Sequence, residues 1–394
     1  HVVVAGTIGI QKSFINVHFS HGFSWTSHEA HAAITFINCV FDCNQHHESL
    51  AFERVVGQCF IFNSCLFRGQ VKLAKPAMRE VLFSGCIFEK AMTIAEHMEQ
   101  GPFNDIIFNS SAGNNTIFHE GVLISNLRNG AITFRDSIVK GAIHLCGRVI
   151  PKLLIGDGEY EELRIDSSIA LESLRLVGIT GERRLLNIKR ISAPNLRFQA
   201  GGVLELTNLT IEKLDFEALS QNGGTIRVQN VLFKDIFRII NTDLGRVVFN
   251  EVDFSTAKLC LDNTYIGDCV FTNVKWRPKK LLFTSNQLTG SDYSNSLKEA
   301  LILKEVYRQL KNVMKAHSNN IDALGFYRNE MDQYWIEINR DNAVSFGDKF
   351  IVFVNKYSSD FGLSLGRPLI LLLAIHLILF LLMILNGFDD LVMF

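Results

Sequence analysis

Apolar residues recur along the first three quarters of the chain in alternating segments that are too short for helices. Pairs of Phe residues mark the first of these segments, and the pairs return every 21 to 26 residues. Alternation over a few residues, bounded by polar steps, is typical of half-buried β-strands. The repeating positions are Phe36 with Phe41, Phe62 with Phe67, Phe83 with Phe88, Phe108 with Phe118, and Phe134 with Val139.

From residue 163 the repeat changes to apolar-x-apolar triplets, which recur about every 8 to 12 residues as far as residue 216 and continue to residue 283. Polar steps such as TNLT, NGG and GDC separate them and supply turns. Short strands at a regular period bury an apolar face only by stacking on their neighbours. The sequence therefore predicts a mainly β chain in which residues 1–290 form a β-solenoid, with Phe and Leu in interior ladders and Cys, Ser or Ala beside them.

A helical period replaces the strand pattern near residue 291. An apolar stripe over 297–314, a polar break at 316–320 and a second stripe over 324–338 predict a helical hairpin within residues 291–345. The next apolar segment, FIVFVNKY (350–357), has two interpretations. It is either a helix that lies at a membrane surface or a strand, because it carries several β-branched residues.

The segment PLILLLAIHLILFLLMIL, residues 368–385, contains no formal charge. As a helix it has a length of about 27 Å, close to the hydrocarbon thickness of a bilayer. The sequence thus predicts that residues 346–394 comprise a juxtamembrane segment and a transmembrane helix from Pro368 to Leu385. A buried helix of a soluble protein is the alternative.

Charge and cysteine usage refine this picture. Lys plus Arg number 39 and Asp plus Glu number 40, so there is no strong nucleic-acid signal. Eight cysteines without a CxxC pair argue against a zinc ribbon or a disulfide framework and suit a reducing compartment. Lys349, Lys356 and Arg367 precede the apolar segment, while Asp389 and Asp390 follow it, so the positive-inside rule predicts a cytoplasmic solenoid.

Three segments of the Phe repeat resemble pentapeptide-repeat coils, in which a small residue stands two positions before a central Phe or Leu. They are Cys39-Val40-Phe41, Cys65-Leu66-Phe67 and Cys86-Ile87-Phe88. The resemblance implies a right-handed coil. The chain departs from the pattern because an apolar residue precedes the centre in place of Asp or Asn and because each coil exceeds twenty residues. The cross-section, square or triangular, stays open.

The last quarter of the chain resembles membrane-anchored pentapeptide-repeat proteins of bacteria. In that group Tyr-x-x-Leu-Lys and Phe-Tyr-x-x-Glu-Met steps on two helices precede a Tyr-Gly-like loop and an Arg-Pro step at the membrane. The resemblance implies a bacterial inner-membrane location, and some relatives continue into spans that resemble small ion channels. The Tyr-to-Gly spacing is longer here. The matching residues are Tyr307, Leu310, Lys311, Phe326, Tyr327, Glu330, Met331, Tyr357, Gly362, Arg367 and Pro368.

Four histidines near the start of the chain, His18, His21, His28 and His31, are weak candidates for metal ligands. Metal binding requires converging imidazoles, yet no Cys or carboxylate completes a recognised signature. The alternative is a solvated cap that closes the first coil, since a solenoid needs an atypical terminal coil. We expect no metal and no cofactor.

The segment GDGEYEELRID (156–166) is the best candidate for catalysis, because paired carboxylates serve glycosidases and lyases. An exposed turn is the favoured alternative, as no sugar-binding aromatic platform accompanies it. No nucleophile motif or phosphate loop is visible either, and the sequence predicts no enzyme.

A basic cluster, Arg183 and Arg184 with Lys189 and Arg190, is a candidate interaction patch for phosphate, lipid headgroups or an acidic protein, or else a solvated face. His376 lies in the middle of the predicted span, where an ionisable group is costly. It either serves a pore or relay, or forms a hydrogen bond between helices of an oligomer.

These features predict a membrane-anchored cytoplasmic β-solenoid that acts as an interaction or sensor scaffold. The expected partners are the lipid bilayer, further copies of the chain and an unknown protein on the solenoid surface. The alternative function is a membrane-permeability effector, channel-like and gated by the solenoid, in bacterial stress or phage defence.

Overall fold

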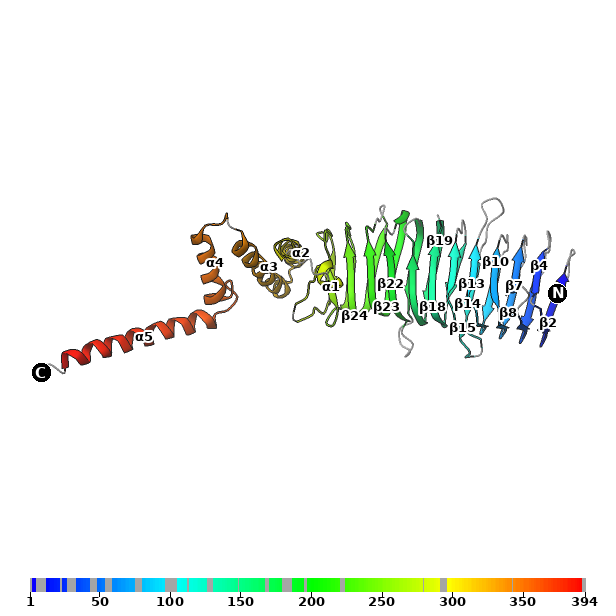
Figure 1. Ribbon diagram of the computed structural model, residues 1–394, viewed down its shortest axis with the longest axis horizontal. Coiled ribbons are helices and arrows are strands. Elements are labelled where there is room, and N and C mark those ends of the chain that lie inside the picture. The colour runs from blue at the N-terminus through cyan, green and yellow to red at the C-terminus, as the bar shows by residue number, and fades with distance from the viewer. Residues whose placement is uncertain are drawn as a thin grey trace. The chain divides into compact units, whose positions relative to one another are not determined.

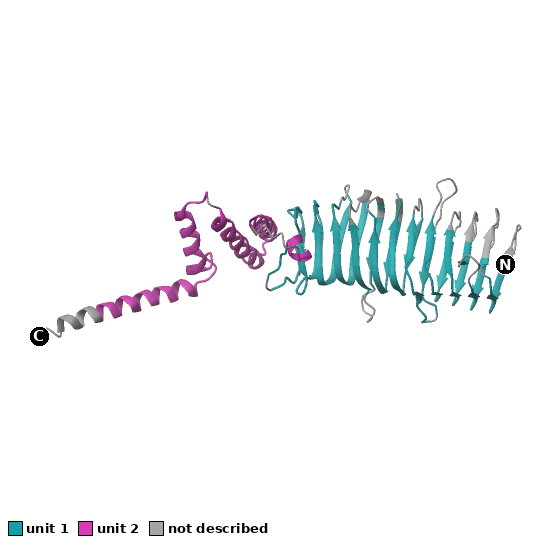
Figure 2. Cartoon of the chain, in the orientation of Figure 1, with its two compact units in different colours: residues 1–283 teal, residues 284–394 magenta. Residues whose placement is uncertain are grey.

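The computed structural model describes residues 2–4, 12–21, 23–26, 33–42, 48–53, 59–74, 80–95, 105–111, 113–125, 130–147, 149–166, 170–178, 186–194, 197–219, 224–278, 280–290, 296–341 and 343–391. The chain divides into two compact units, residues 1–283 and residues 284–394 (Figure 2). The first unit contains the strands and the second contains the helices. The predicted class, a mainly β solenoid followed by helices, is confirmed.

The strands of the first unit stack in three parallel ladders (Figure 1). In the first ladder lie β2 (Lys12–Ile15), β5 (Ile34–Ile37), β8 (Cys59–Asn63), β11 (Glu80–Ser84), β14 (Asp105–Asn109), β17 (Ala131–Phe134), β19 (Val149–Gly156) and β21 (Ala170–Val177).

The second ladder holds β3 (His18–Phe19), β6 (Val40–Phe41), β9 (Leu66–Phe67), β12 (Ile87–Phe88) and β15 (Thr116–Phe118). The third holds β1 (Val2–Val4), β4 (Phe23–Thr26), β7 (Glu48–Glu53), β10 (Gln70–Ala74), β13 (Met92–Ala95) and β16 (Val122–Ser125).

Later strands are longer and run through more than one ladder. The strands β18 (Ser137–Cys146), β20 (Gly158–Ile165) and β22 (Leu186–Pro194) continue the second and third ladders. The strands β23 (Arg197–Glu217) and β24 (Thr225–Ile240) extend all three, and β25 (Val248–Asp253), β26 (Lys258–Cys260) and β27 (Val270–Thr272) follow. The cross-section, left open by the sequence, is therefore built from three stacked faces.

Two columns of Phe rings fill the interior of the first coils. Successive rings within a column are nearly parallel, with interplanar angles of 2° to 16° and centroid separations of 4.5 to 5.1 Å. Rings of different columns meet edge to face, as Phe62 and Phe67 do at 5.5 Å. One column comprises Phe14, Phe36, Phe62, Phe83, Phe108 and Phe134, and the other comprises Phe19, Phe41, Phe67, Phe88 and Phe118.

Cysteines beside these columns act as small buried polar groups. The thiols of Cys39, Cys65 and Cys86 donate to the carbonyls of Phe14, Phe36 and Phe62 in the preceding coil, at 3.4 to 3.5 Å. Burial raises the pKa of Cys86 well above its ordinary value. A protonated, buried thiol is a poor nucleophile, so Cys86 serves as a small packing residue between coils.

The turn from the first to the second ladder uses a left-handed residue. Asn38, Asn208 and Asn230 adopt φ values of 51°, 55° and 50° there. Asn tolerates this conformation better than most residues. Because the turns stack, the amide of Asn230 donates to the side-chain oxygen of Asn208 at 2.9 Å, so one residue type serves both the local turn and the contact between coils.

The second unit contains α1 (Ser285–Thr289), α2 (Ser296–Ala316), α3 (Asn320–Arg340), α4 (Phe346–Ser359) and α5 (Gly366–Leu391). The helices α2 and α3 form the predicted hairpin. Ion pairs join them, one between Lys304 and Glu337 and one between Lys311 and Glu330 at 2.6 Å. The segment whose sequence left helix and strand open is the helix α4, capped by the Ser345 hydroxyl, which accepts from the amide of Asp348.

The Phe columns yield a stability prediction. We expect Phe62→Ala to lower the free energy of unfolding by about 3–5 kcal/mol, because it removes a fully buried ring from the middle of a column. Ile61→Ala, in the same strand but pointing outward, is the matched control and should cost less than half as much. Denaturant unfolding of the full chain in detergent, followed by circular dichroism, measures both, and equal losses would contradict the interior role of the columns.

Candidate functional site

A column of charged side chains runs along the outside of the second ladder. Each of its members directly follows an inward-facing residue, and those inward residues pair from coil to coil. Acidic and basic residues alternate along the column, apart from His119, whose Nδ1 lies 3.3 Å from the Lys140 ammonium group. This charged column comprises Asp42, Arg68, Glu89, His119, Lys140, Glu161, Lys189, Glu212 and Lys234. Opposite charges on adjacent strands favour this register, and like charges would oppose it.

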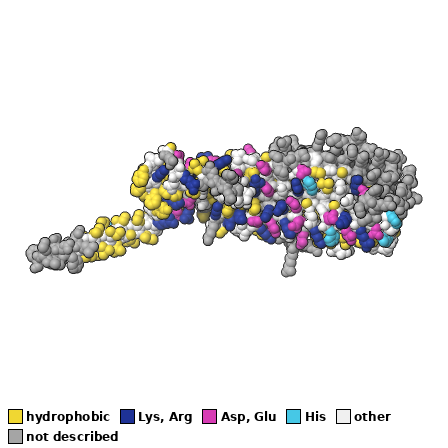
Figure 3. All heavy atoms as spheres, viewed as in Figure 1, with side chains coloured by type: hydrophobic (Ala, Val, Ile, Leu, Met, Phe, Trp, Pro, Cys, Tyr) yellow, Lys and Arg dark blue, Asp and Glu magenta, His cyan; other side chains and the backbone are white. Residues whose placement is uncertain are grey.

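The C-terminal half of the charged column borders an open hollow with a volume of about 360 Å³. Lys140, Glu161, Lys189, Glu212 and Lys234 all line it. Figure 3 shows basic and acidic side chains interspersed along the face of the solenoid that it displays. The hollow therefore offers a mixed-charge polar surface, without a field of one sign that would attract a polyanion.

The described half of the basic patch and the acidic segment 156–166, which are separate motifs in the sequence, lie next to each other at the hollow. Lys189 pairs with Glu161 at 2.6 Å, and Arg190 lies 3.9 Å from Glu162. The hydrogen bond with Glu161 raises the pKa of Lys189. Half of the predicted basic patch is thus neutralised by the acidic segment, while Arg183 and Arg184 lie outside the described residues.

The first acidic residue of this segment, Asp157, is part of the folded core of the solenoid. Asp157 is buried, at 6% exposure, in the turn that joins β19 to β20. The adjacent Tyr160 is buried, and its hydroxyl donates to the carbonyl of Gly156 at 3.1 Å. Burial raises the pKa of Tyr160 above its ordinary value, so its hydroxyl is a neutral donor in the core.

The candidate metal ligands do not converge within the described residues. His18 hydrogen bonds to Asp42 at 2.6 Å, and this contact, together with Arg68, lowers the pKa of the Asp42 carboxyl. His21 forms a hydrogen bond with the Ser20 hydroxyl at 2.9 Å, and His28 and His31 lie outside the described residues. Among the described residues no group of three or more His, Cys, Asp or Glu side chains has the arrangement of a metal site.

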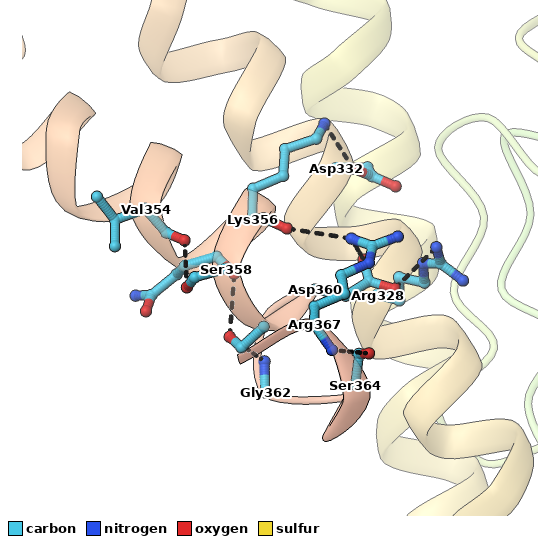
Figure 4. Close-up of polar contacts among 11 residues, drawn as sticks. Arg328, Asp332, Val354, Lys356, Ser358, Asp360, Gly362, Ser364 and Arg367 are labelled. Atoms are coloured by element: carbon cyan, nitrogen blue, oxygen red, sulfur yellow. Dashed lines mark hydrogen bonds and ion pairs between the residues drawn. The ribbon is translucent and has the colours of Figure 1, made fainter. Parts of the chain in front are cut away.

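In the helical unit, charged residues converge on Asp360, at the start of the turn between α4 and α5 (Figure 4). Its side chain is only 13% exposed and lies between two guanidinium groups. Arg328 of α3 approaches to 2.8 Å, and Arg367 of α5 to 3.6 Å. The carboxylate of Asp360, at the end of α4, thus pairs with α3 and with α5. Arg367 of α5 also donates to the carbonyl of Lys356 in α4 at 3.4 Å. We refer to Asp360, Arg328 and Arg367 as the Asp360 cluster.

The backbone explains why this cluster is needed. Asp360, Phe361 and Gly362 have φ values of 52°, 58° and 84° in succession. A left-handed conformation costs most residues about 1–2 kcal/mol, although Asp tolerates it and Gly is free to adopt it. Phe361 has no such tolerance, but its side chain is buried at 8% exposure. Burial of that ring and the ion pairs of Asp360 together offset the strain of the turn.

A second pair fastens α4 to α3. Lys356 lies 2.8 Å from Asp332 (Figure 4). Its ammonium group also lies 5.9 Å from the ring centroid of Trp335. Trp335 also contacts Phe353 of α4, with ring centroids 6.0 Å apart. One side of α4 is therefore held against α3 by a cation, a carboxylate and an aromatic ring.

The predicted span lies in α5. Within the described residues, Gly366–Ile384 is the one helical segment long and apolar enough to cross a membrane, and none of it is buried. Pro368 occupies the first turn, where its missing amide hydrogen costs no helical bond. The ring of His376 donates from Nδ1 to the carbonyl of Leu372 at 3.0 Å, on its own helix. Leu385 lies within α5, but its side chain is outside the described residues.

Sequence reasoning missed both the charged column and the Asp360 cluster. The column emerges only when the register of the coils is known. For the cluster the sequence singled out the Gly362 loop and the Arg367-Pro368 step, but not the carboxylate at position 360 that Arg367 meets. The sequence did contain a signal for the cluster, namely an acidic residue directly before Phe-Gly at the end of an apolar helix.

The Asp360 cluster yields a second prediction. Asp360→Asn keeps a residue that tolerates φ near 52° but removes the charge between two arginines. We expect a loss of about 1 kcal/mol, discounted for the exposure of both arginines, and therefore about fivefold faster hydrogen exchange of the turn amides at positions 360–364.

Exchange measured by mass spectrometry on the full chain tests this expectation. Glu305→Gln, which breaks an exposed pair with Arg308 on α2, serves as the matched control and should leave exchange in the turn unchanged. Unaltered exchange in Asp360→Asn would show that the cluster does not hold the turn.

Comparison with known proteins adds no relative. No family model, no curated protein and no solved structure matches this chain. The resemblance to pentapeptide-repeat proteins therefore stays a prediction, whereas the parallel β-solenoid follows from the strand pairing itself.

Proposed function

We propose that the chain is a membrane-anchored scaffold, in which α5 crosses the bilayer and the solenoid presents its sides to a partner protein in the cytoplasm. The observation that carries the proposal is the exposure of α5. The nineteen residues Gly366–Ile384 are apolar except for Arg367 and His376, and none is buried against the rest of the chain. Exposed apolar area on this scale is unfavourable in water, so the helix requires a lipid or protein environment.

The length of α5 supports a spanning position over a surface position. Residues 366–384 extend about 28 Å as a helix, which matches the hydrocarbon core of a bilayer. Apolar residues also surround the helix on all sides, as Leu371, Leu373 and Leu377 illustrate with exposures of 47% to 61%. A helix that lies flat on a membrane has a polar face instead.

The distribution of cations and thiols supports a cytoplasmic solenoid. Lys349, Lys356 and Arg367 precede the span, and loops rich in Lys and Arg stay on the cytoplasmic side. Seven cysteines of the described residues are free thiols, and most are buried in the coils. Such thiols persist in a reducing compartment, and we propose the inner membrane of a bacterium as the location.

The outer surface of the solenoid supports a binding role over a catalytic one. The carboxylates that were the best catalytic candidates are engaged, since Glu161 and Glu162 pair with Lys189 and Arg190. The stacked ladders hold these side chains at fixed positions from coil to coil, and a protein partner with complementary charges would meet a preorganised surface. Self-association through α5 would present several such surfaces at once.

A second candidate function is supported by His376. An ionisable residue lies within an otherwise apolar span. Placing such a residue in the bilayer is unfavourable in free energy, so residues of this kind usually have a function. Assembly of several α5 helices would surround these imidazoles with protein and form a permeation path gated by the solenoid. This is the permeability effector that the sequence also allowed.

Membrane potential separates the two functions. We expect bacterial cells that express the full chain to keep the same potential, read with a voltage-sensitive dye, as cells that express residues 1–345, because a scaffold conducts no ions. Depolarisation by the full chain alone would contradict the scaffold and favour the effector. His376→Leu then provides the matched variant, since it removes the imidazole while keeping an apolar span.

A further inference from the structure

A second apolar surface lies outside the proposed span, on α4. Its side chains occupy one helical face, at positions i, i+4, i+7, i+8 and i+11 of the helix. Their exposures are 83% for Phe346, 55% for Phe350, 44% for Phe353, 40% for Val354 and 59% for Tyr357. We call these five residues the α4 apolar face. Figure 3 shows hydrophobic side chains gathered on this helix and along α5.

The side of α4 that carries Lys356 faces α3. Lys356 is held by Asp332 and Trp335 of α3, and the turn after α4 is held by the Asp360 cluster. These contacts set the orientation of α4. Phe353, at the edge of the α4 apolar face, contacts Trp335 of α3, whereas Phe346, Phe350, Val354 and Tyr357 stay 40% to 83% exposed. Rings within the face also contact each other, as Phe353 and Tyr357 do at 4.6 Å.

We propose that the α4 apolar face lies in the interface between the lipid headgroups and the acyl chains, as a second membrane contact beside α5. This inference rests on the proposed span. Only six residues, 360–365, separate α4 from α5, and Leu365 within that turn is 91% exposed. The start of α5 and the end of α4 thus meet the same membrane surface. Phe and Tyr side chains suit that depth, where an apolar body faces the chains and a polar edge faces water.

Charge pairing identifies apolar burial, and not attraction to anionic lipid, as the source of binding. Two of the cations around the α4 apolar face are engaged with carboxylates, Lys356 with Asp332 and Arg367 with Asp360, so within the described part of the chain Lys349 is the one lysine of α4 without an ion pair. An interfacial helix that depends on anionic headgroups carries unpaired Lys and Arg along its polar face instead. The proposed contact should therefore form equally on zwitterionic and anionic phospholipid.

Photocrosslinking of the full chain tests this proposal. p-Benzoylphenylalanine is placed at Phe350 or Val354 on the α4 apolar face, or at Asn355 on the opposite side as the matched control. Each protein is reconstituted in phosphatidylcholine nanodiscs, with and without phosphatidylglycerol, and irradiated. We expect at least fivefold more lipid adduct, measured by mass spectrometry, at positions 350 and 354 than at 355, and the same yield in both lipid compositions. Using two positions on the face guards against a local fold defect at either one.

Other outcomes would overturn the proposal. A crosslink from position 350 to a second copy of the chain would make the face a protein interface, and equal lipid adducts at 350 and 355 would mean that no face is selected. Recovery of the unreacted benzophenone, without lipid adducts, at both positions would place α4 outside the membrane. Resistance of the same proteins to alkaline carbonate extraction reports on α5 alone, so loss of the span is distinguishable from loss of the α4 contact.

Discussion

The in-register stacking of aromatic rings is the constraint on which the solenoid depends. Neighbouring strands lie about 4.7–4.9 Å apart, and this spacing is also favourable for offset-stacked rings. Rings such as Phe36 and Phe62, with centroids 4.8 Å apart, therefore satisfy the backbone and the core at once. Once this register is fixed, the left-handed Asn turns stack, the thiols meet the carbonyls of the preceding coil, and the charged column comes together on the outside.

The sequence was sufficient for features that depend on local period. Phe pairs and apolar triplets predicted the solenoid, and helical stripes predicted the hairpin and the apolar helix. Features that depend on the register between coils could not be predicted from the sequence. The spacing between paired residues of successive coils varies from 21 residues, between Phe67 and Phe88, to 30 residues, between Phe88 and Phe118, so nothing in the sequence aligned Glu161 with Lys189. Asp360 meets Arg328 across 32 positions of sequence, and that contact exists only because α4 folds back along α3.

The solenoid and the last two helices distribute polarity in opposite ways. In the solenoid, apolar residues lie inside and charged residues pair on the outside, as Glu161 does with Lys189. Around α4 and α5, the carboxylate of Asp360 lies between helices, while Phe350 and Leu373 are exposed at 55% and 61%. A surface of the second kind is stable in contact with lipid, where internal polar pairs hold helices together and apolar side chains face outward. This inversion is the physical basis for an anchored scaffold.

Anchoring through α5 is the central claim, and membrane extraction tests it most directly. Cell membranes that contain the full chain are washed with alkaline carbonate, beside membranes from cells that express a variant with Leu373→Arg and Leu377→Arg. Two charges at the centre of the span cost several kcal/mol, enough to abolish stable insertion. The account predicts that the parent chain stays in the membrane pellet and that the variant is released. Release of the parent chain would contradict the account.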